Sequence, residues 1–326
     1  ANTDRDSYYG PGNDPLKAYG KTTDLTAMGG AQYVHTFDKC FFMPSDLTAG
    51  LEYNRDRLKD NMWGYNRHTD QTVNIYSAFL QNEWKNDRWG ILIGGRLDKH
   101  NMVDNVIFSP RANLRFNPTQ NINLRLSYSS GFRAPQAFDE DMHIENVGGT
   151  VAMIERAKDL KEEKSQSFSV SADMYHRFGA FQTNLLIEGF YTRLTDVFVL
   201  GKPYDRGDGI LVKTRSNGPG AKVMGLTLEG KVAYLSILQI QAGLTLQRSR
   251  YDEPHKWHDD APAEKKIFRT PDTYGYFTAT CTPIKPLSIA LSGTYTGRML
   301  VQRMDITAEN AELGKMPERK AEAIRT

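Results

Sequence analysis

Residues 122–129 read Ile-Asn-Leu-Arg-Leu-Ser-Tyr-Ser, and residues 167–174 read Ser-Phe-Ser-Val-Ser-Ala-Asp-Met. In both stretches apolar and polar residues alternate, which is the period of an extended strand with one apolar face. Between them lies a polar segment of roughly 30 residues, much longer than a hairpin connection needs. Loops of this length usually carry function, so this segment is the first place to look for a site.

The same alternation recurs along almost the whole chain, for example in residues 47–54 and 238–247. About twelve such segments can be counted, each close to the roughly 9 to 11 residues that a tilted membrane-spanning strand requires. No stretch approaches the roughly 18 apolar residues of a membrane helix. The sequence therefore predicts an all-β protein whose strands form an antiparallel transmembrane β-barrel.

The composition fits a barrel as well as a soluble protein. Hydrophobic residues make up 39% and charged residues 25%, and the mean hydropathy is -0.56. A barrel with a polar lumen and polar loops has a similar average, so hydropathy does not decide. Several aromatic residues fall at predicted strand ends, where an interfacial girdle would place them: Tyr53, Trp84, Trp89 and Tyr234. A soluble β-sandwich, with these rings in its core, is the alternative.

The predicted connections alternate between short and long. The short ones are residues 39–46, 85–88, 117–120, 176–179 and 283–286, with one further short turn at 100–105 on the other side. The long ones are residues 56–71, 132–164, 201–209 and 252–268. This alternation is typical of a bacterial outer-membrane barrel with its long loops extracellular. Within it, Gly218-Pro219-Gly220 predicts a bulge or bend in a long strand pair.

Three motifs carry a resemblance to a known family. They are Phe132-Arg133-Ala134-Pro135, the segment Asp-Leu-Lys-Glu-Glu-Lys-Ser at residues 159–165, and Asn217 followed by Ala221 and by Gly-Leu-Thr-Leu-Glu at residues 225–229. In order and spacing they resemble the TonB-dependent outer-membrane receptors. The second motif of that family usually reads Asn-Pro-Asn-Leu-Lys-Pro-Glu. Residues 157–163 here read Ala-Lys-Asp-Leu-Lys-Glu-Glu, so both prolines are absent.

The resemblance implies a receptor whose complete barrel has about 22 strands around a plugged lumen. Residues 1–326 would form a partial barrel domain of about twelve strands, and we expect the plug domain and the final strands to lie outside this chain. Energy-coupled import of a scarce nutrient follows, with a metal chelate as the substrate: a ferric siderophore, haem or cobalamin. The alternative is a passive outer-membrane barrel or a surface binding module without TonB coupling.

The resemblance also implies partners. They are a TonB-type energy-coupling protein acting through the plug, outer-membrane lipid, the small-molecule chelate and, as a further candidate, a surface lipoprotein. A net charge of +2, from 41 Lys and Arg against 39 Asp and Glu, gives no reason to expect nucleic-acid binding.

Ligand-binding candidates lie in the long loops: Phe132, Arg133, His143, Trp257 and His258. Haem receptors similar to this family carry a haem-ligating histidine between the corresponding boxes, so His143 is a candidate haem ligand; an ordinary solvated histidine is the alternative. Arg133 could pair with a carboxylate of the plug or of a neighbouring strand, or face an anionic ligand.

Two acidic or mixed clusters could bind metal, with a solvated loop as the alternative for each. Asp139, Glu140, Asp141 and Glu145 offer oxygen ligands for Ca²⁺. His255, His258, Asp259 and Asp260 surround Trp257 with transition-metal ligand types. We predict no resident metal or cofactor from either cluster, because sequence alone shows no supporting arrangement around them.

The remaining reactive residues do not indicate an enzyme. His35 and His176 lie near strand bodies, but neither has a serine-containing catalytic motif beside it. Cys40 and Cys281 fall beside short turns on strands that are about ten apart in order, too far for a disulfide across the barrel, so both are predicted to be free.

Overall fold

The computed structural model of the chain describes residues 1–8, 19–63, 67–136, 145–147, 150–202, 204–207, 211–256, 262–306 and 319–325. These residues contain 21 strands and no helix, and the main sheet has 14 strands. No helix among them is long and apolar enough to cross a membrane. The predicted all-β antiparallel architecture is confirmed, and the predicted count of about twelve strands is close to that of the main sheet.

The main sheet is a meander in which neighbouring strands pair antiparallel. Its spatial order is β1 (Asn2–Tyr8), β2 (Tyr19–Cys40), β3 (Met43–Met62), β4 (Arg67–Lys85), β5 (Trp89–His100), β6 (Ile107–Thr119), β7 (Ile122–Arg133), β10 (Glu163–Phe178), β11 (Phe181–Thr195), β15 (Ala221–Tyr234), β16 (Leu238–His255), β18 (Thr273–Ile284) and β19 (Leu287–Thr296). The short β17 (Glu264–Lys266) pairs with β16.

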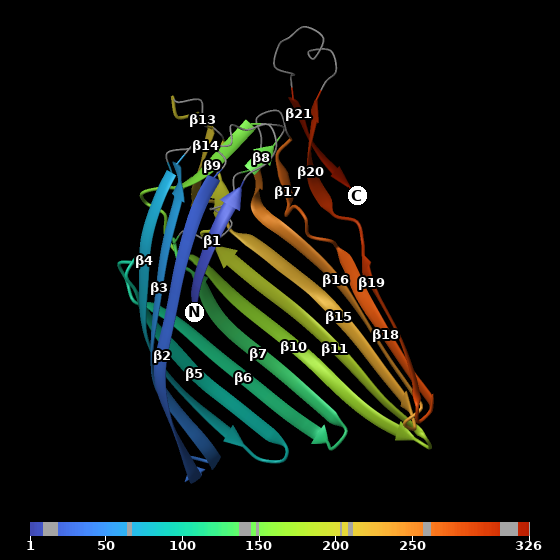
Figure 1. Cartoon of the computed structure of the whole chain (residues 1–326). Helices are drawn as coiled ribbons and strands as arrows, with labels where there is room; N and C mark the ends of the chain where they lie inside the picture. The colour runs from blue at the N-terminus through green and yellow to red at the C-terminus, as the bar shows by residue number, and fades with distance from the viewer. Residues whose placement is uncertain are drawn as a thin grey trace.

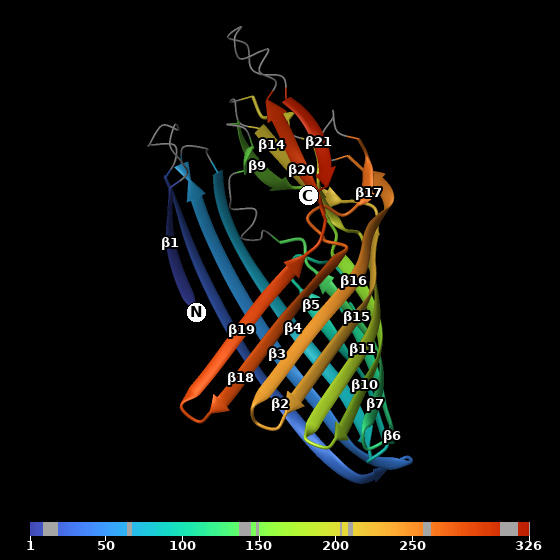
Figure 2. The ribbon, with the colours of Figure 1, turned by 90° about the vertical axis from the view of Figure 1, so that its right-hand side faces the viewer.

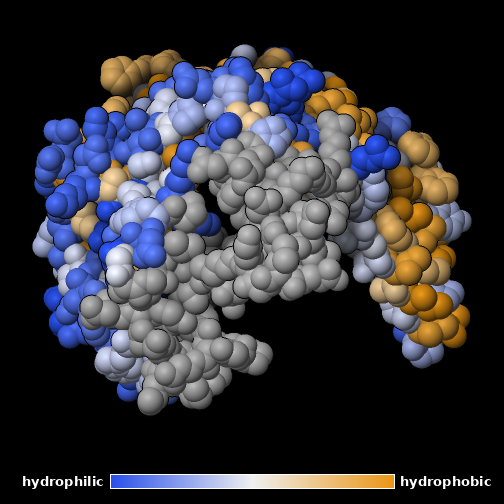
Figure 3. Space-filling model, turned by 90° about the horizontal axis from the view of Figure 1, so that it is seen from above, coloured by the Kyte–Doolittle hydropathy of each residue, from blue (hydrophilic) through white to orange (hydrophobic). Residues whose placement is uncertain are grey.

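The sheet curves into a trough that is open along one side (Figures 1 and 2). Seen from above, the wall forms an open arc (Figure 3). Strands β1 and β19 are its two edges, so the described part of the chain does not close a barrel. A separate hairpin of β20 (Leu300–Ile306) and β21 (Arg319–Arg325) follows β19.

The side chains of this wall divide between two faces. Cross-strand neighbours Leu124, Ala172, Ile187, Leu228 and Leu244 form one apolar row across five strands. One residue along, the row reads Arg125, Ser171, Glu188, Thr227 and Thr245 on the opposite face. The apolar residues are not packed into a core: Val170, for example, remains 59% exposed. An apolar face that no second sheet covers excludes the soluble β-sandwich. It indicates that this face contacts lipid.

Two bands of aromatic rings border the apolar face. In the lower band Trp89 stacks on Phe116 at 4.3 Å, and Phe178 lies 5.8 Å from Phe181. In the upper band Tyr128 lies 4.8 Å from Phe168. Phe168 and Phe178 are ten residues apart on β10, the length expected for one tilted crossing of the hydrocarbon region.

The predicted girdle residues are largely confirmed. Trp84, Trp89 and Tyr234 lie at or within one residue of a strand end, at the lower band. Tyr53 does not, because it lies in the middle of β3, where it packs 4.9 Å from Tyr76 in the upper band. The upper band therefore crosses strands that continue well beyond it.

Strands β2, β3 and β4 are 22, 20 and 19 residues long, about twice the predicted length. The long loop predicted at residues 56–71 is therefore wrong. Strand β3 continues to Met62, and β4 begins at Arg67. Above the upper band both faces of this hairpin carry charged and polar side chains, so the alternation that marks a strand is lost from the sequence although the backbone pairing continues.

All five predicted short turns are confirmed, and they lie together at the lower end of the wall in Figure 1. The short turn between β5 and β6, at residues 101–106, is confirmed on the other side. One short turn was not predicted: Leu235-Ser236-Ile237, between β15 and β16. The sequence gives no turn signal here, because Leu235 and Ile237 are apolar. In the structure Leu235 adopts a positive φ of 49°.

Candidate functional site

A second, smaller sheet lies at the end of the wall opposite the short turns (Figure 1). Its order is β12 (Phe198–Leu200), β14 (Leu211–Asn217), β9 (Thr150–Arg156) and β8 (Glu145–Val147), with β13 (Tyr204–Asp205) paired to β14. Strands β8 and β9 belong to the connection from β7 to β10, and the other three belong to the connection from β11 to β15. Strands β9 and β14 pair in parallel, and this pairing joins the two connections into one sheet.

This sheet corrects two expectations from the sequence. The connection predicted at residues 201–209 extends from residue 196 to residue 220 and contains three strands. Gly218-Pro219-Gly220 is not a bulge within a strand pair. It marks the point where the chain leaves β14 in the small sheet and enters β15 in the main sheet.

The motif residues meet where the two sheets join. Arg133, at the end of β7, faces Glu163, at the start of β10. The Glu163 carboxylate accepts a hydrogen bond of 2.8 Å from the backbone N–H of Phe198, and the Arg133 guanidinium lies 5.6 Å from the centre of the Phe198 ring. This cation–π contact holds Arg133 against β12. Phe132 lies on the outward face of β7, opposite Lys164.

Asn217 connects the other two motifs. Its side-chain oxygen accepts a hydrogen bond of 2.8 Å from the Lys161 N–H, and its amide donates to the carbonyl oxygens of Lys161 at 3.1 Å and Asp196 at 2.8 Å. One side chain thus fixes the segment before β10, the end of β11 and the end of β14. The motifs recognised in the sequence form a structural junction at the rim.

Beside this junction lies a cavity of about 570 Å³ between the upper end of the wall, as drawn in Figure 1, and the small sheet. The wall contributes Arg67, His68, Thr69, Met102 and Pro135, and the connection containing β9 contributes Met153, Ile154, Glu155, Arg156, Ala157, Lys158 and Leu160, with Arg206 from the other connection. Four Lys and Arg side chains face one carboxylate, that of Glu155. The cavity is therefore suited to an anionic ligand.

Three of the cations that line the cavity, Arg67, Arg156 and Arg206, interact with other residues of the protein. Arg67 donates to the Asp60 carboxylate at 2.8 and 3.1 Å, and Thr22 donates to the same carboxylate at 2.7 Å. Arg156 donates to the Gln71 side-chain oxygen and to the Pro135 carbonyl, both at 3.0 Å.

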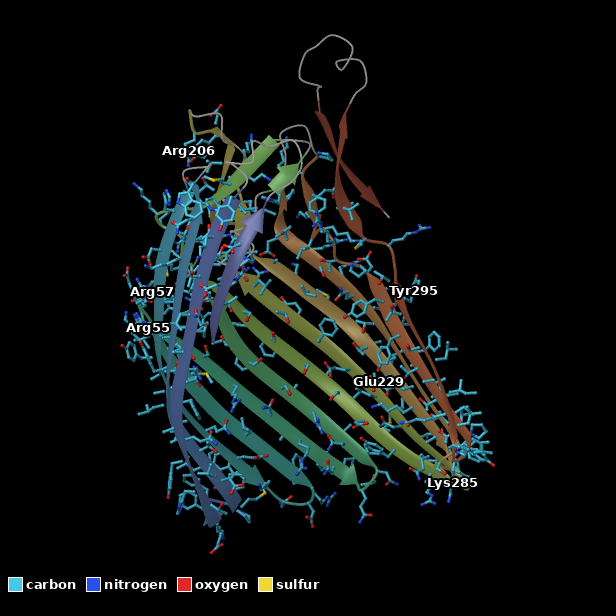
Figure 4. All side chains as sticks on the ribbon, viewed as in Figure 1. Arg55, Arg57, Arg206, Glu229, Lys285 and Tyr295 are labelled. Atoms are coloured by element: carbon cyan, nitrogen blue, oxygen red, sulfur yellow. The ribbon has the colours of Figure 1, made fainter. Side chains whose placement is uncertain are left out.

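Arg206, which Figure 4 shows at the upper end of the molecule, lies 4.0 Å from Glu155. Lys158 differs from these arginines. Among the residues that the structure describes, it makes no ion pair and no hydrogen bond, and it remains exposed. Its ammonium is therefore available to a ligand entering the cavity.

Three described histidines lie at this end of the wall: His68, His100 and His255. His68 lines the cavity, and its Nδ1 lies 3.0 Å from the Asn61 side-chain oxygen. His100 is fully buried, its Nδ1 accepts a hydrogen bond of 3.0 Å from the Met102 N–H, and its Nε2 lies 3.2 Å from the Gln136 side-chain oxygen. This arrangement requires the neutral tautomer with hydrogen on Nε2. His255 ends β16, where burial lowers the pKa of its imidazole below the ordinary value. No group of three or more metal-ligand side chains occurs in the described ranges.

Several sequence candidates lie outside the described residues: His143, Trp257, His258, Asp139, Glu140, Asp141, Asp259 and Asp260. Glu145 begins β8, but its side chain is not described. Phe132 and Arg133 are next to the cavity without lining it. The lining residues Arg67, Arg156, Lys158 and Arg206 were not predicted, because in the sequence they look like solvated loop charges. Cys40 and Cys281 are free, as predicted.

The wall, its two aromatic bands and the sheet above it define an outer-membrane type of β-barrel. The chain belongs to the TonB dependent receptor-like, beta-barrel family, whose model matches residues 1–304. A search of curated proteins gives no match. The predicted resemblance is confirmed, and the family is one of outer-membrane receptors and transporters rather than enzymes.

Solved structures with the same fold include proteins from three bacteria. The siderophore receptor PirA of Pseudomonas aeruginosa matches with a TM-score of 0.62 and 18% identity, over 90% of this chain and 52% of that one. PirA of Acinetobacter baumannii matches with a TM-score of 0.64 and 16% identity, over 95% and 48%. The FrpB iron transporter of Neisseria meningitidis matches with a TM-score of 0.62 and 13% identity, over 94% and 48%. The chain thus spans about half the length of these structures.

Proposed function

We propose that the complete protein is a receptor for energy-coupled import of a scarce nutrient across the bacterial outer membrane, and that its substrate is an anionic metal chelate. The observation that carries this proposal is the basic cavity at the rim, formed by the wall and by two outer connections joined as one sheet. The names of the similar structures, which include siderophore receptors and an iron transporter, support the same substrate class.

The inner face of the wall suits a polar plug moved by a TonB-type protein. On β5, Arg96 binds Glu52 at 3.1 Å and Asp98 at 2.8 Å. On β15, Glu229 binds Lys231 at 3.0 Å and accepts a hydrogen bond of 3.2 Å from Gln241. Figure 4 shows Glu229 on the wall of the trough. Such networks can exchange hydrogen bonds with a polar domain or with water as the plug rearranges.

Orientation is part of the proposal: the small sheet is extracellular, and the five short turns predicted from the sequence are periplasmic. A peptide tag inserted after Asp104, in the β5–β6 turn, should be labelled by antibody on intact cells. A tag inserted after Gln120, in the β6–β7 turn, should be labelled only after the outer membrane is permeabilised. The two turns lie at opposite ends of β6, and both are short, so the same tag can be inserted in each. Reversed labelling would overturn the orientation.

Substrate charge can be tested at Lys158. Replacing it by glutamine removes a cavity cation that holds nothing else in the described structure, so folding should be unchanged. Affinity of the complete receptor for an anionic ferric catecholate should fall about fivefold, the effect of losing one favourable charge contact of about 1 kcal/mol. Lys285→Gln, in the β18–β19 turn at the other end of the wall, is the matched control. Equal affinities for parent and Lys158→Gln would argue against chelate binding in this cavity.

Measurements of ligand binding and of uptake separate the remaining alternatives, which are a haem receptor, a passive barrel and a receptor with a surface lipoprotein partner. A haem receptor that uses His143 as an axial ligand should lose haem binding on His143→Ala, whereas a siderophore or cobalamin receptor should be indifferent. A passive barrel would show uptake that does not depend on the TonB-type protein. A surface lipoprotein partner would be indicated if it raised the affinity of the complete receptor for its ligand.

A further inference from the structure

The outward face of β3 changes character at the upper aromatic band. Below Tyr53 it carries Ala49 and Leu51, and above Tyr53 it carries Arg55, Arg57 and Lys59, all on the same face because they are two residues apart. Figure 4 shows Arg55 and Arg57 projecting from the outer side of the wall, away from the trough. An apolar segment, a tyrosine and a basic segment thus follow one another along a single strand.

The basic segment carries unbalanced positive charge. Among the described residues, the carboxylate within ion-pair distance of it is Asp70, which lies 3.8 Å from Arg57 and 3.5 Å from Lys59. Arg55 makes no ion pair or hydrogen bond with the residues that the structure describes. The Nε atom of Arg57 is buried without a hydrogen-bond partner there. Three cations and one carboxylate leave a net charge of +2 for this cluster.

Directly below the tyrosine band lies an apolar groove of about 790 Å³ on the same outward face. The small side chains of Ala49 and Ala78 form its floor, and the larger Leu51, Leu80 and Phe108 border it. Register explains the hollow: Ala49 lies beside Leu80, and Ala78 beside Leu51, so small residues alternate with large ones across β3 and β4. The three bordering side chains are each more than half exposed.

We propose that this surface binds one phosphorylated lipid of the outer leaflet, with its acyl chain in the groove and its phosphate on Arg55 and Arg57. Leu51 and Arg55 are four residues apart, about 13 Å along the strand, which suits a chain below the interface and a phosphate above it. The proposal rests on the membrane placement given above. A second copy of the chain is the less favourable occupant, because a symmetric contact through this face would bring two basic clusters together.

The test uses the complete receptor in detergent, titrated with phosphatidylglycerol or with phosphatidylcholine of the same acyl chains and followed by native mass spectrometry. The parent should bind phosphatidylglycerol more tightly. The double variant Arg55→Gln/Arg57→Gln should weaken phosphatidylglycerol binding about 25-fold, because each basic residue near an anionic headgroup contributes about a factor of five. Arg55→Lys/Arg57→Lys should retain most of it. The control is Arg88→Gln/Lys285→Gln, which removes two cations at the opposite end and should change binding less than twofold.

Ala78→Phe fills the groove without touching the cations. It should weaken binding several-fold, and inorganic phosphate at millimolar concentration should compete poorly, because it lacks the acyl chain. Unchanged phosphatidylglycerol binding in the double glutamine variant would overturn the proposal. Full competition by inorganic phosphate with no effect of Ala78→Phe would overturn it too, as would a dimer that these substitutions dissociate. Chelate affinity is the separate readout of the proposed function, and neither set of variants should alter it.

Discussion

Replacing Arg67 by alanine is expected to destabilise the outer part of the β3–β4 hairpin by about 3–5 kcal/mol, because it leaves the Asp60 carboxylate buried without its cation. The two side chains are only 9% and 3% exposed, and the ion pair is 2.8 Å long. The effect should be measured as faster hydrogen exchange of the backbone amides in residues 56–62 and 67–73 of the complete receptor. Amides in the membrane band should be unaffected.

The neighbouring arginine provides a matched control. Arg57 lies on the same hairpin, but its side chain is 43% exposed and its ion pair with Asp70 is 3.8 Å long. Arg57→Ala should therefore cost less than about 1 kcal/mol. The double variant Asp60→Ala/Arg67→Ala should recover part of the loss, because no orphaned charge remains. If Arg67→Ala were no more disruptive than Arg57→Ala, the buried pair would not be what holds this hairpin together.

Gly220→Ala should destabilise the complete receptor by about 1–3 kcal/mol, the usual range for an overpacked site. A Cβ atom there would lie 2.6 Å from the Asp252 carboxylate, 2.8 Å from the Leu194 carbonyl oxygen and 3.2 Å from the Arg193 guanidinium. Either the backbone of β11 moves away, or Asp252 leaves Arg193, which binds it at 2.6 Å and lowers its pKa. The urea concentration at the midpoint of unfolding in lipid vesicles should fall.

Gly230 is the control on the following strand. An added Cβ there meets nothing within 4 Å, so Gly230→Ala should be neutral or slightly stabilising, since alanine has less conformational freedom in the unfolded chain. A loss of stability with Gly230→Ala equal to that with Gly220→Ala would mean that glycine flexibility, rather than the close approach at Gly220, sets the effect.

Within the membrane band the fold could be predicted from the sequence because one physical requirement acts on every residue. Lipid demands an apolar face, so β7 and β10 alternate without interruption. Above the band the outward face of β3 and β4 no longer meets lipid, and the inward face holds buried polar pairs such as Asp60 with Arg67. Charges such as Arg57 and Asp60 then occupy both faces, and the period of two disappears although the strands continue.

The small sheet could not be predicted for a different reason. Strand β9 pairs with β14, about 60 residues away, and in parallel, so no local turn signal links them. The short apolar run at residues 151–154 was the available sign of a strand, but it shows no alternation. For the site, the sequence singled out the long segment between β7 and β10, with Arg133 near its start. The cavity cations Arg156 and Lys158 lie in the same segment. They could not be picked out, because the sequence around them is rich in charged residues, as in an ordinary solvent-exposed loop.

Because β9 and β14 pair across two different connections, we expect that the two connections can be exchanged only together. Grafting only residues 134–162 from another receptor would remove β9, the partner of β14, and replace eight of the thirteen residues that line the cavity. A chimera intended to change ligand preference must therefore carry residues 134–162 and 196–220 from the same donor.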